Sequence, residues 1–315
     1  MFELVDVQAA ARRIAGRVHR TPLLSASRLG TRGGVQLWLK AESLQKTGSF
    51  KSRGALNAVT QLSADDRARG VIAVSAGNHA QALAWASTAV GARCTVVMPA
   101  AAVQAKVDAS RGYGATVIQH ESGSAMFARA FALAEEHGYV FIHPFDNAHV
   151  AAGAGTVALE ILEDLPDLDA IIVPVGGGGL LSGVAVALKA LRPAVRVFGV
   201  EPEGASTLRM SLDAGTLQTV DVPRTVADGL AAPTTSQMVV DITRRLVDDV
   251  IVLPDEEIVD AMRHLLASAK LMAEPAGAAA TAALLSGRLA LPAGARVVSI
   301  VSGGNVDLAR LQSLL

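Results

Sequence analysis

Cysteine and aromatic residues are scarce in this chain, and its positive and negative charges nearly cancel. Cys94 is the single cysteine among 315 residues, so neither an internal disulfide nor a metal site of several cysteines can form. Aromatic residues make up only 3% of the chain, which argues against a surface that stacks on nucleic-acid bases. Lys and Arg number 28 against 29 Asp and Glu, and a net charge of −1 attracts neither nucleic acid nor an anionic membrane. We therefore expect a small molecule as the partner.

Long hydrophobic runs are also missing. No stretch reaches the length of a transmembrane helix, and residues 1–20 lack the continuous apolar centre of a secretory signal peptide. Together with the lone cysteine, these features predict a cytoplasmic protein that does not enter a membrane.

Hydrophobic residues are abundant, at 51% of the chain, and Ala, Val and Leu supply most of them. Short valine-rich runs alternate with longer alanine-rich segments, which is typical of parallel strands joined by helical crossovers, an α/β fold. The predicted strands are 71–74, 94–98, 115–119, 140–142, 170–175, 195–200 and 296–301. The predicted helices are 78–90, 101–111, 124–137, 153–165, 180–191, 255–271 and 277–285. Residues 202–233 contain three prolines and few apolar runs, which predicts a loop-rich segment.

Lys51 lies in a distinctive sequence, between Phe50 and a run of small residues. A lysine amine attacks a carbonyl to form a Schiff base only when it is unprotonated, so burial or a cofactor must lower its pKa. Phe50 could stack on a planar cofactor. The alternative is that Lys51 and Arg53 are ordinary polar residues at the start of a helix.

Four consecutive glycines, Gly176, Gly177, Gly178 and Gly179, separate a predicted strand from a predicted helix. Their amides can converge with the helix N-terminus on a phosphate group, although close packing would also explain them. The loop matches neither a Walker loop nor a dinucleotide fingerprint. Glu201 nevertheless ends the next strand, where such folds bind ribose, so a nicotinamide-dependent enzyme stays an alternative.

Two further turns follow predicted strands, and their polar groups suit an anionic substrate. Ser75 and Asn78 can cap the next helix while nearby amides receive a carboxylate, whereas His79 is more often structural than a base. Ser302 could donate to a ring nitrogen or simply cap a helix. A phosphate loop, a reactive amine, a stacking ring and a carboxylate turn together describe a site for pyridoxal phosphate and an amino acid.

These motifs strongly resemble the serine and threonine dehydratases, with serine racemase as a relative, in the fold type II group of pyridoxal-phosphate enzymes, whose fold is that of the tryptophan synthase β subunit. The resemblance runs nearly end to end. It is carried by His19-Arg20-Thr21-Pro22-Leu23, Ser49-Phe50-Lys51-Ser52-Arg53-Gly54-Ala55, Ser75-Ala76-Gly77-Asn78-His79, Gly176 to Gly179, Ala227-Asp228-Gly229, Glu274-Pro275-Ala276-Gly277-Ala278 and Ser302-Gly303-Gly304-Asn305.

The resemblance implies roles for residues of this chain. Lys51 would hold pyridoxal phosphate as a Schiff base and remove the substrate's α-proton. The other cofactor-binding residues would be Phe50, Asn78, Gly176, Gly177, Gly178, Gly179, Glu274 and Ser302. The substrate-binding residues would be Ser75, Ala76, Gly77, Asn78, His79 and Gly229. The implied reaction is β-elimination from L-threonine or L-serine, which yields 2-oxobutanoate or pyruvate and ammonia.

The resemblance also implies an architecture. Residues 1–47 and 148–315 would form a large cofactor domain, and 48–147 a small mobile α/β domain that closes over the substrate. Both would contain parallel-rich sheets flanked by helices. Relatives are commonly homodimers or larger assemblies. Ten residues after Asn305 leave no room for an appended regulatory domain, so we expect no feedback of that kind.

Two departures from the family pattern narrow the expected chemistry. Ala76 stands where serine racemases carry a serine on the opposite ring face, so we expect dehydration to exceed racemisation. A cation site of some relatives aligns with Glu201, Ala205 and Thr207, and the missing aspartate removes a ligand that hard cations favour. We therefore expect no bound metal. A serine racemase and a dehydratase of another 3-hydroxy amino acid, such as 3-hydroxyaspartate or 3-phenylserine, remain alternatives within the group.

Overall fold

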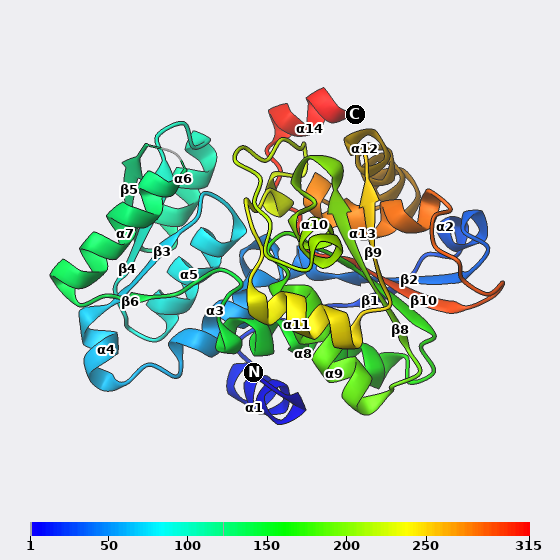
Figure 1. The fold of residues 1–315 in the computed structure, drawn as a ribbon, viewed down its shortest axis with the longest axis horizontal. Coiled ribbons are helices and arrows are strands. Elements are labelled where there is room, and N and C mark those ends of the chain that lie inside the picture. Colours follow the sequence, from blue (N-terminus) through cyan, green and yellow to red (C-terminus); the bar gives the residue numbers. More distant parts are fainter. Residues whose placement is uncertain (1, 122) are drawn as a thin grey trace.

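The structure is a computed structural model that describes residues 2–121 and 123–315. Its strands form two separate sheets, which occupy the two lobes seen in Figure 1. The six-stranded sheet has the order β1-β2-β10-β7-β8-β9, and the four-stranded sheet has the order β5-β4-β3-β6. β1 pairs antiparallel with β2, and every other pairing is parallel. The α/β class expected from the sequence is confirmed.

The strands of the larger sheet come from both ends of the chain. They are β1 (Leu23–Ser25), β2 (Gln36–Ala41), β7 (Ala170–Pro174), β8 (Arg196–Pro202), β9 (Asp249–Leu253) and β10 (Arg296–Val301). The strands of the smaller sheet are continuous in sequence: β3 (Val71–Val74), β4 (Cys94–Pro99), β5 (Ala115–His120) and β6 (Val140–Phe141). Seven of these strands coincide closely with predicted ones, whereas β1, β2 and β9 lie outside the predicted set.

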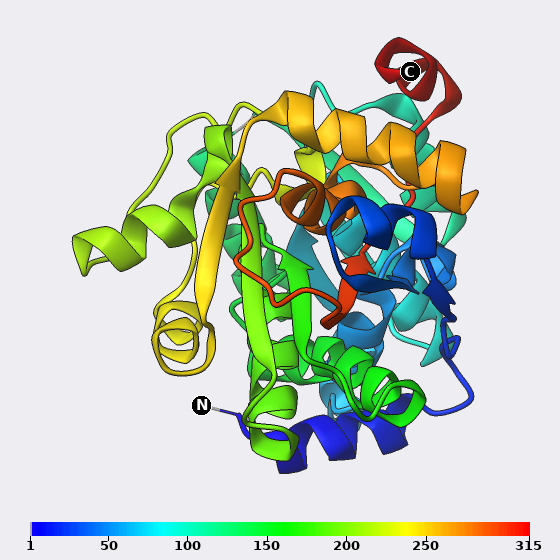
Figure 2. The ribbon, with the colours of Figure 1, turned by 90° about the vertical axis from the view of Figure 1, so that its right-hand side faces the viewer.

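Helices cover both faces of each sheet, and their apolar sides form four core clusters. Figure 2 shows the larger sheet between α1, α8 and α9 on one face and α12 and α13 on the other. The helices of the first half of the chain are α1 (Leu4–Ile14), α2 (Ser27–Arg32), α3 (Lys51–Val59), α4 (Ala64–Arg69), α5 (Asn78–Ala89), α6 (Gln104–Gly112), α7 (Ser124–His137) and α8 (Ala148–Asp164). Those of the second half are α9 (Gly179–Leu191), α10 (Thr207–Ala214), α11 (Gln237–Leu246), α12 (Asp255–His264), α13 (Pro275–Leu285) and α14 (Leu308–Leu314).

Two predicted segments differ from the structure. Residues 202–233 were expected to be loop-rich, but α10 lies within them, because the buried Glu201 accepts the amides of Leu208 and Arg209 and so caps the helix. The helix predicted over 255–271 ends as α12 at His264 and continues as a π-helical turn. Lys270, with a left-handed φ of 58°, then terminates it.

Candidate active site

Lys51 begins α3, and the residues before it are bound to the turn after β10. The Phe50 amide donates to the Ser302 carbonyl at 3.0 Å, and Ser49 forms an isolated antiparallel bridge with Gly303. The Nζ atom of Lys51 donates to the Pro144 carbonyl at 3.0 Å. Two segments that are far from Lys51 in sequence therefore determine where its amine lies.

Burial changes the chemistry of the Lys51 amine. It lowers the pKa of Lys51 to about 8, because the charged form loses hydration in the site. At pH 7 roughly one amine in ten is then neutral, several hundred times the fraction of a free lysine. The Nζ atom lies 5.1 Å from the centroid of the Phe50 ring. The structure thus places at the start of α3 a lysine that is predisposed to act as a nucleophile or a base.

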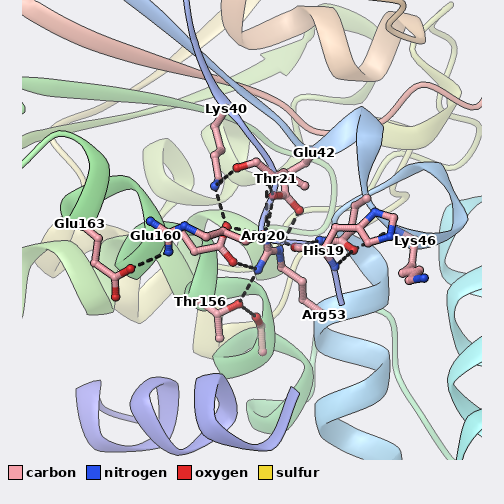
Figure 3. Close-up of polar contacts among 12 residues, drawn as sticks. His19, Arg20, Thr21, Lys40, Glu42, Lys46, Arg53, Thr156, Glu160 and Glu163 are labelled. Atoms are coloured by element: carbon pink, nitrogen blue, oxygen red, sulfur yellow. Dashed lines mark hydrogen bonds and ion pairs between the residues drawn. The ribbon is translucent and has the colours of Figure 1, made fainter. Parts of the chain in front are cut away.

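A buried charge cluster around Arg53, two residues after Lys51, holds α3 in place (Figure 3). The Arg53 guanidinium donates two bonds of 2.8 Å to Glu42 and bonds of 2.6 and 2.9 Å to Glu160. Lys40 donates to Glu160 at 2.6 Å, so two cations face two carboxylates. Glu42 precedes α3 in the chain and Glu160 belongs to α8, so the cluster ties the lysine helix to the larger sheet and its helices.

The four glycines form the turn from β7 to α9, and their neighbours leave no room for side chains. A Cβ on Gly177 would lie 2.0 Å from Cδ1 of Phe145, and one on Gly178 would lie 2.3 Å from Val239. Gly178 also has a φ of 89°, which favours glycine. Phe145 follows Pro144, whose carbonyl accepts from Lys51. One segment thus contacts both the glycine loop and the lysine amine.

The amides of this turn are free to bind an anion. Across the described residues, the N–H groups of 176–181 donate to no other group, because they precede the first hydrogen-bonded turn of α9. Unpaired amides at a helix N-terminus attract negative charge. The turn can therefore hold a phosphate group, as the sequence predicts.

Asn78, the first residue of α5, joins three parts of the chain. Its Nδ2 atom donates to Oε1 of Glu274 at 2.6 Å, and its Oδ1 atom accepts from Nδ2 of Asn305 at 2.7 Å. The same Asn305 amide donates to the carbonyl of Thr47 at 2.7 Å. Asn305 therefore orients the Asn78 amide, with its N–H groups directed away from Asn305, and connects it to the loop that carries Lys51.

Glu274 is 3% exposed and lies next to two glycine turns. A Cβ on Gly303 would lie 2.3 Å from Oε1 of Glu274, and one on Gly229 would lie 3.6 Å from the same atom. Burial raises the pKa of Glu274 to about 7, although the bond from Asn78 opposes this shift. The hydroxyl of Ser302 has no hydrogen-bond partner within the described part of the chain, so it is available to a ligand.

The turn after β3 is partly exposed except at its last residue. Ser75, Ala76, Gly77 and Asn78 are each half-buried, and the Ser75 hydroxyl accepts the Gly77 amide at 3.2 Å. His79 is buried, its Nε2 atom bonds to the carbonyl of Ile142, and its Nδ1 atom has no partner among the described residues. Burial, assisted by the charge of Lys51, lowers the pKa of His79 to about 3, so the ring is neutral at pH 7. A neutral ring favours the structural role for this histidine.

The comparisons with known proteins agree with this geometry. The family model described as pyridoxal-phosphate dependent enzyme matches residues 14–303. This chain belongs to that family. It is 42% identical to the L-threonine ammonia-lyase of Thermotoga maritima, over 100% of this chain and 78% of that protein. It is also 42% identical to the serine racemase of Dictyostelium discoideum, over 99% of this chain and 97% of that protein.

Solved structures show the same family and fold. The serine racemase of maize superimposes with a TM-score of 0.95 at 39% identity, over 99% of this chain and 96% of that structure. The fold type II assignment is therefore confirmed, and so is the dependence on pyridoxal phosphate.

The residues of this pyridoxal-phosphate enzyme fit the cofactor. The unpaired amides of 176–181 match its phosphate, the free hydroxyl of Ser302 matches its ring nitrogen, and the Lys51 amine matches its aldehyde. Gly303 and Gly229 both lie against the Glu274 carboxylate and close to the Asn78 amide. Sequence reasoning missed Asn305, Thr47 and Pro144 as parts of this arrangement. Of these three residues, only Asn305 had a signal in the sequence, because it ends the motif Ser302-Gly303-Gly304-Asn305.

Glu201 is positioned differently from the ribose-binding residue that a nicotinamide enzyme needs. It is fully buried, and its two carboxylate oxygens accept the amides of Leu208 and Arg209 at 2.9 and 2.8 Å. Burial raises its pKa to about 7 despite these bonds. Glu201 is therefore a structural helix cap and is not available to bind ribose. The nicotinamide-dependent alternative loses the residue on which it rested. In the described part of the chain, no group of three His, Cys, Asp or Glu side chains is placed to bind a metal ion.

Proposed function

We propose that this protein is a pyridoxal-phosphate-dependent ammonia-lyase that converts L-threonine, L-serine or both to a 2-oxo acid and ammonia. The observation that carries the proposal is the Lys51 amine, held by the carbonyl of Pro144 while the neighbouring Phe145 packs on the glycine loop. The name of the Thermotoga relative supports this activity, and its similarity extends along the whole chain.

The reaction needs a base at the substrate's α-carbon. When bound, pyridoxal phosphate withdraws electrons from that carbon and makes its proton acidic. The amine of Lys51, whose pKa is lowered to about 8, accepts the α-proton. The β-hydroxyl takes up a proton and leaves as water, and the released enamine is then hydrolysed by one water molecule to give ammonia and the 2-oxo acid. Threonine thus gives 2-oxobutanoate and serine gives pyruvate.

The other residues of the site bind and orient. The amides of 176–181 hold the phosphate, and the Asn78 amide, fixed by Asn305, donates toward the cofactor's phenolic oxygen. Ser302 offers a neutral hydroxyl to the ring nitrogen, which favours prompt loss of a β-substituent over transamination. Phe50 packs beside the ring. Ser75 and the amides of the turn after β3 hold the substrate's carboxylate, and His79 supports that turn.

Ala76 separates this activity from that of a racemase. It is half-buried in the turn that faces the substrate, and its methyl group cannot carry a proton to the second face of the α-carbon. Dehydration of L-serine should therefore far exceed formation of D-serine. Comparable rates of D-serine and pyruvate formation by the purified enzyme would contradict this role of Ala76.

We further propose that residues 48–147 form a small domain that closes over the substrate, against a large domain of 1–47 and 148–315. The continuous four-stranded sheet supports this division. No helix in the described residues is long and apolar enough to cross a membrane. On the sequence arguments given above, we propose a cytoplasmic homodimer or larger homo-oligomer.

Borohydride reduction of the purified holoenzyme tests the chemistry at Lys51. A Schiff base with the lysine makes the protein yellow, and reduction should bleach the colour and leave a pyridoxyl group on the peptide that contains Lys51. Lys51→Ala should lose both the label and the activity, whereas Lys46→Arg, a change at a nearby lysine outside the site, should keep both. A label on any other lysine would refute the assignment.

A substrate panel tests the reaction itself. L-Serine, L-threonine, 3-hydroxyaspartate and 3-phenylserine should be compared by release of 2-oxo acid and ammonia. We expect the highest kcat/KM with L-threonine or L-serine. A higher value for 3-hydroxyaspartate or 3-phenylserine would keep the mechanism and replace the proposed substrate.

A further inference from the structure

A second candidate binding site lies away from the catalytic residues, where the end of α1 meets α3, α4 and α5. It is a surface hollow of about 560 Å³. Arginines supply half of its lining residues, and none of the six is acidic: Arg13, Arg17, Thr60, Arg67, Ala89 and Val90. The volume falls within the range of about 300–1,000 Å³ that is usual for small-molecule sites.

The three arginines are held by neutral groups. Arg13 donates to the side-chain oxygen of Asn57 at 3.2 Å, Arg17 to the carbonyl of Ala89 at 3.0 Å, and Arg67 to the carbonyl of Leu62 at 3.3 Å. Within the described residues, none of the three arginines forms an ion pair. Each guanidinium is therefore oriented by the protein, yet its charge is not neutralised.

Arg67 carries a further sign of an incomplete site. Its Nε atom is buried and has no hydrogen-bond partner among the described residues. The acid beside it in sequence, Asp66, pairs with Arg69 instead. A buried N–H of a charged group without an acceptor is unfavourable, and an anion in the hollow would provide that acceptor.

We propose that this hollow binds a polyphosphate anion, that is, a ligand with two or more linked phosphate groups. Three guanidinium groups repel one another and are stabilised together by one multiply charged anion. The planar fork of arginine matches the oxygens of a phosphate group in bidentate geometry. A chain of phosphates suits three separate forks, since each guanidinium can then pair with a phosphate group of its own.

The position of the hollow joins two parts of the chain. Arg13 and Arg17 belong to the N-terminal segment, whereas Arg67 and Ala89 belong to α4 and the end of α5, which lie on the side of the smaller sheet (Figure 1). A bound polyphosphate therefore contacts both the large and the small domain as divided above. None of its lining residues belongs to the proposed cofactor or substrate site, so the two sites are tested separately.

Calorimetric titration of the holoenzyme with sodium tripolyphosphate tests the site. The bound cofactor occupies the glycine loop, so the probe does not bind there. We expect saturable binding that weakens as NaCl increases, because salt screens the charges. Single changes Arg13→Gln, Arg17→Gln and Arg67→Gln should each weaken binding about tenfold, the usual effect of losing one charge-assisted hydrogen bond.

A matched control comes from the same helix. Arg12 is exposed on α1, but it does not line the hollow, so Arg12→Gln should bind tripolyphosphate as the unchanged protein does. Arg17→Lys retains the charge but not the fork, and should bind with an intermediate affinity. Circular dichroism spectra like that of the unchanged protein would show that each variant folds.

Three results would overturn the proposal. The first is tripolyphosphate binding no tighter than sulfate binding at equal ionic strength. The second is a loss of tripolyphosphate affinity in Arg12→Gln equal to that in the hollow variants. The third is a tripolyphosphate affinity that none of the three hollow variants changes. If citrate bound more tightly than tripolyphosphate at the same arginines, the ligand of the hollow would be a polycarboxylate and not a polyphosphate.

Discussion

The buried charge cluster around Arg53 makes a quantitative prediction for Arg53→Met. Arg53 is fully buried and donates to both oxygens of Glu42 and both of Glu160. Without it, the Glu42 carboxylate keeps, among the described residues, only the hydroxyl of Thr21, and Glu160 keeps Lys40. Removing one partner of a buried ion pair costs about 3–5 kcal/mol, because a carboxylate is left buried without compensation. We therefore expect the free energy of unfolding to fall by about that amount.

Urea unfolding of the apoprotein, followed by circular dichroism, measures this loss. Arg20→Met is the matched control, because Arg20 also pairs with two acids, Glu163 and Asp164, but its side chain is 48% exposed. Exposed ion pairs contribute about 0–1 kcal/mol, so the control should lose less than the core variant by at least about 2 kcal/mol.

Two measurements would refute this reasoning. Equal losses for Arg53→Met and Arg20→Met would show that the cluster adds no more than a surface pair. The double variant Glu42→Gln, Arg53→Met removes the carboxylate that lost its ion pair, leaves the pair of Lys40 with Glu160 intact, and should recover part of the loss. Failure to recover any stability would show that the loss comes from packing, and not from the unpaired carboxylate.

Three further predictions concern the site. Asn305→Ala should lower kcat/KM about tenfold and shift the cofactor's absorption band, because Asn78 loses the bond that orients its amide; an unshifted band would contradict this role. Since His79 stays neutral in the folded state, stability should fall as the pH falls from about 6.5 toward 3, and His79→Gln should flatten this dependence in urea unfolding. The rate at which the apoprotein captures pyridoxal phosphate should rise with pH through a midpoint at about 8, as the Lys51 amine becomes neutral; a midpoint near 10 would contradict the effect of burial.

Local patterns were sufficient for much of the fold. Valine runs correctly located β3, β4, β7, β8 and β10, because a strand buried on both faces must be continuously apolar. α10 was missed, since it depends on Glu201, whose carboxylate caps a helix that begins several residues later. A cap of this kind has no signature in the composition of the segment it stabilises.

The sequence by itself determined the family and the cofactor, because the motifs at Lys51, at the four glycines and at Ser302 each need particular residue types in a short local arrangement. Only the tertiary structure decided which residues hold these motifs together. Asn305 reaches Asn78 across 227 positions, and Arg53 reaches Glu160 across 107. Such partners are set by how strands and helices pack, and this information is spread over the whole chain.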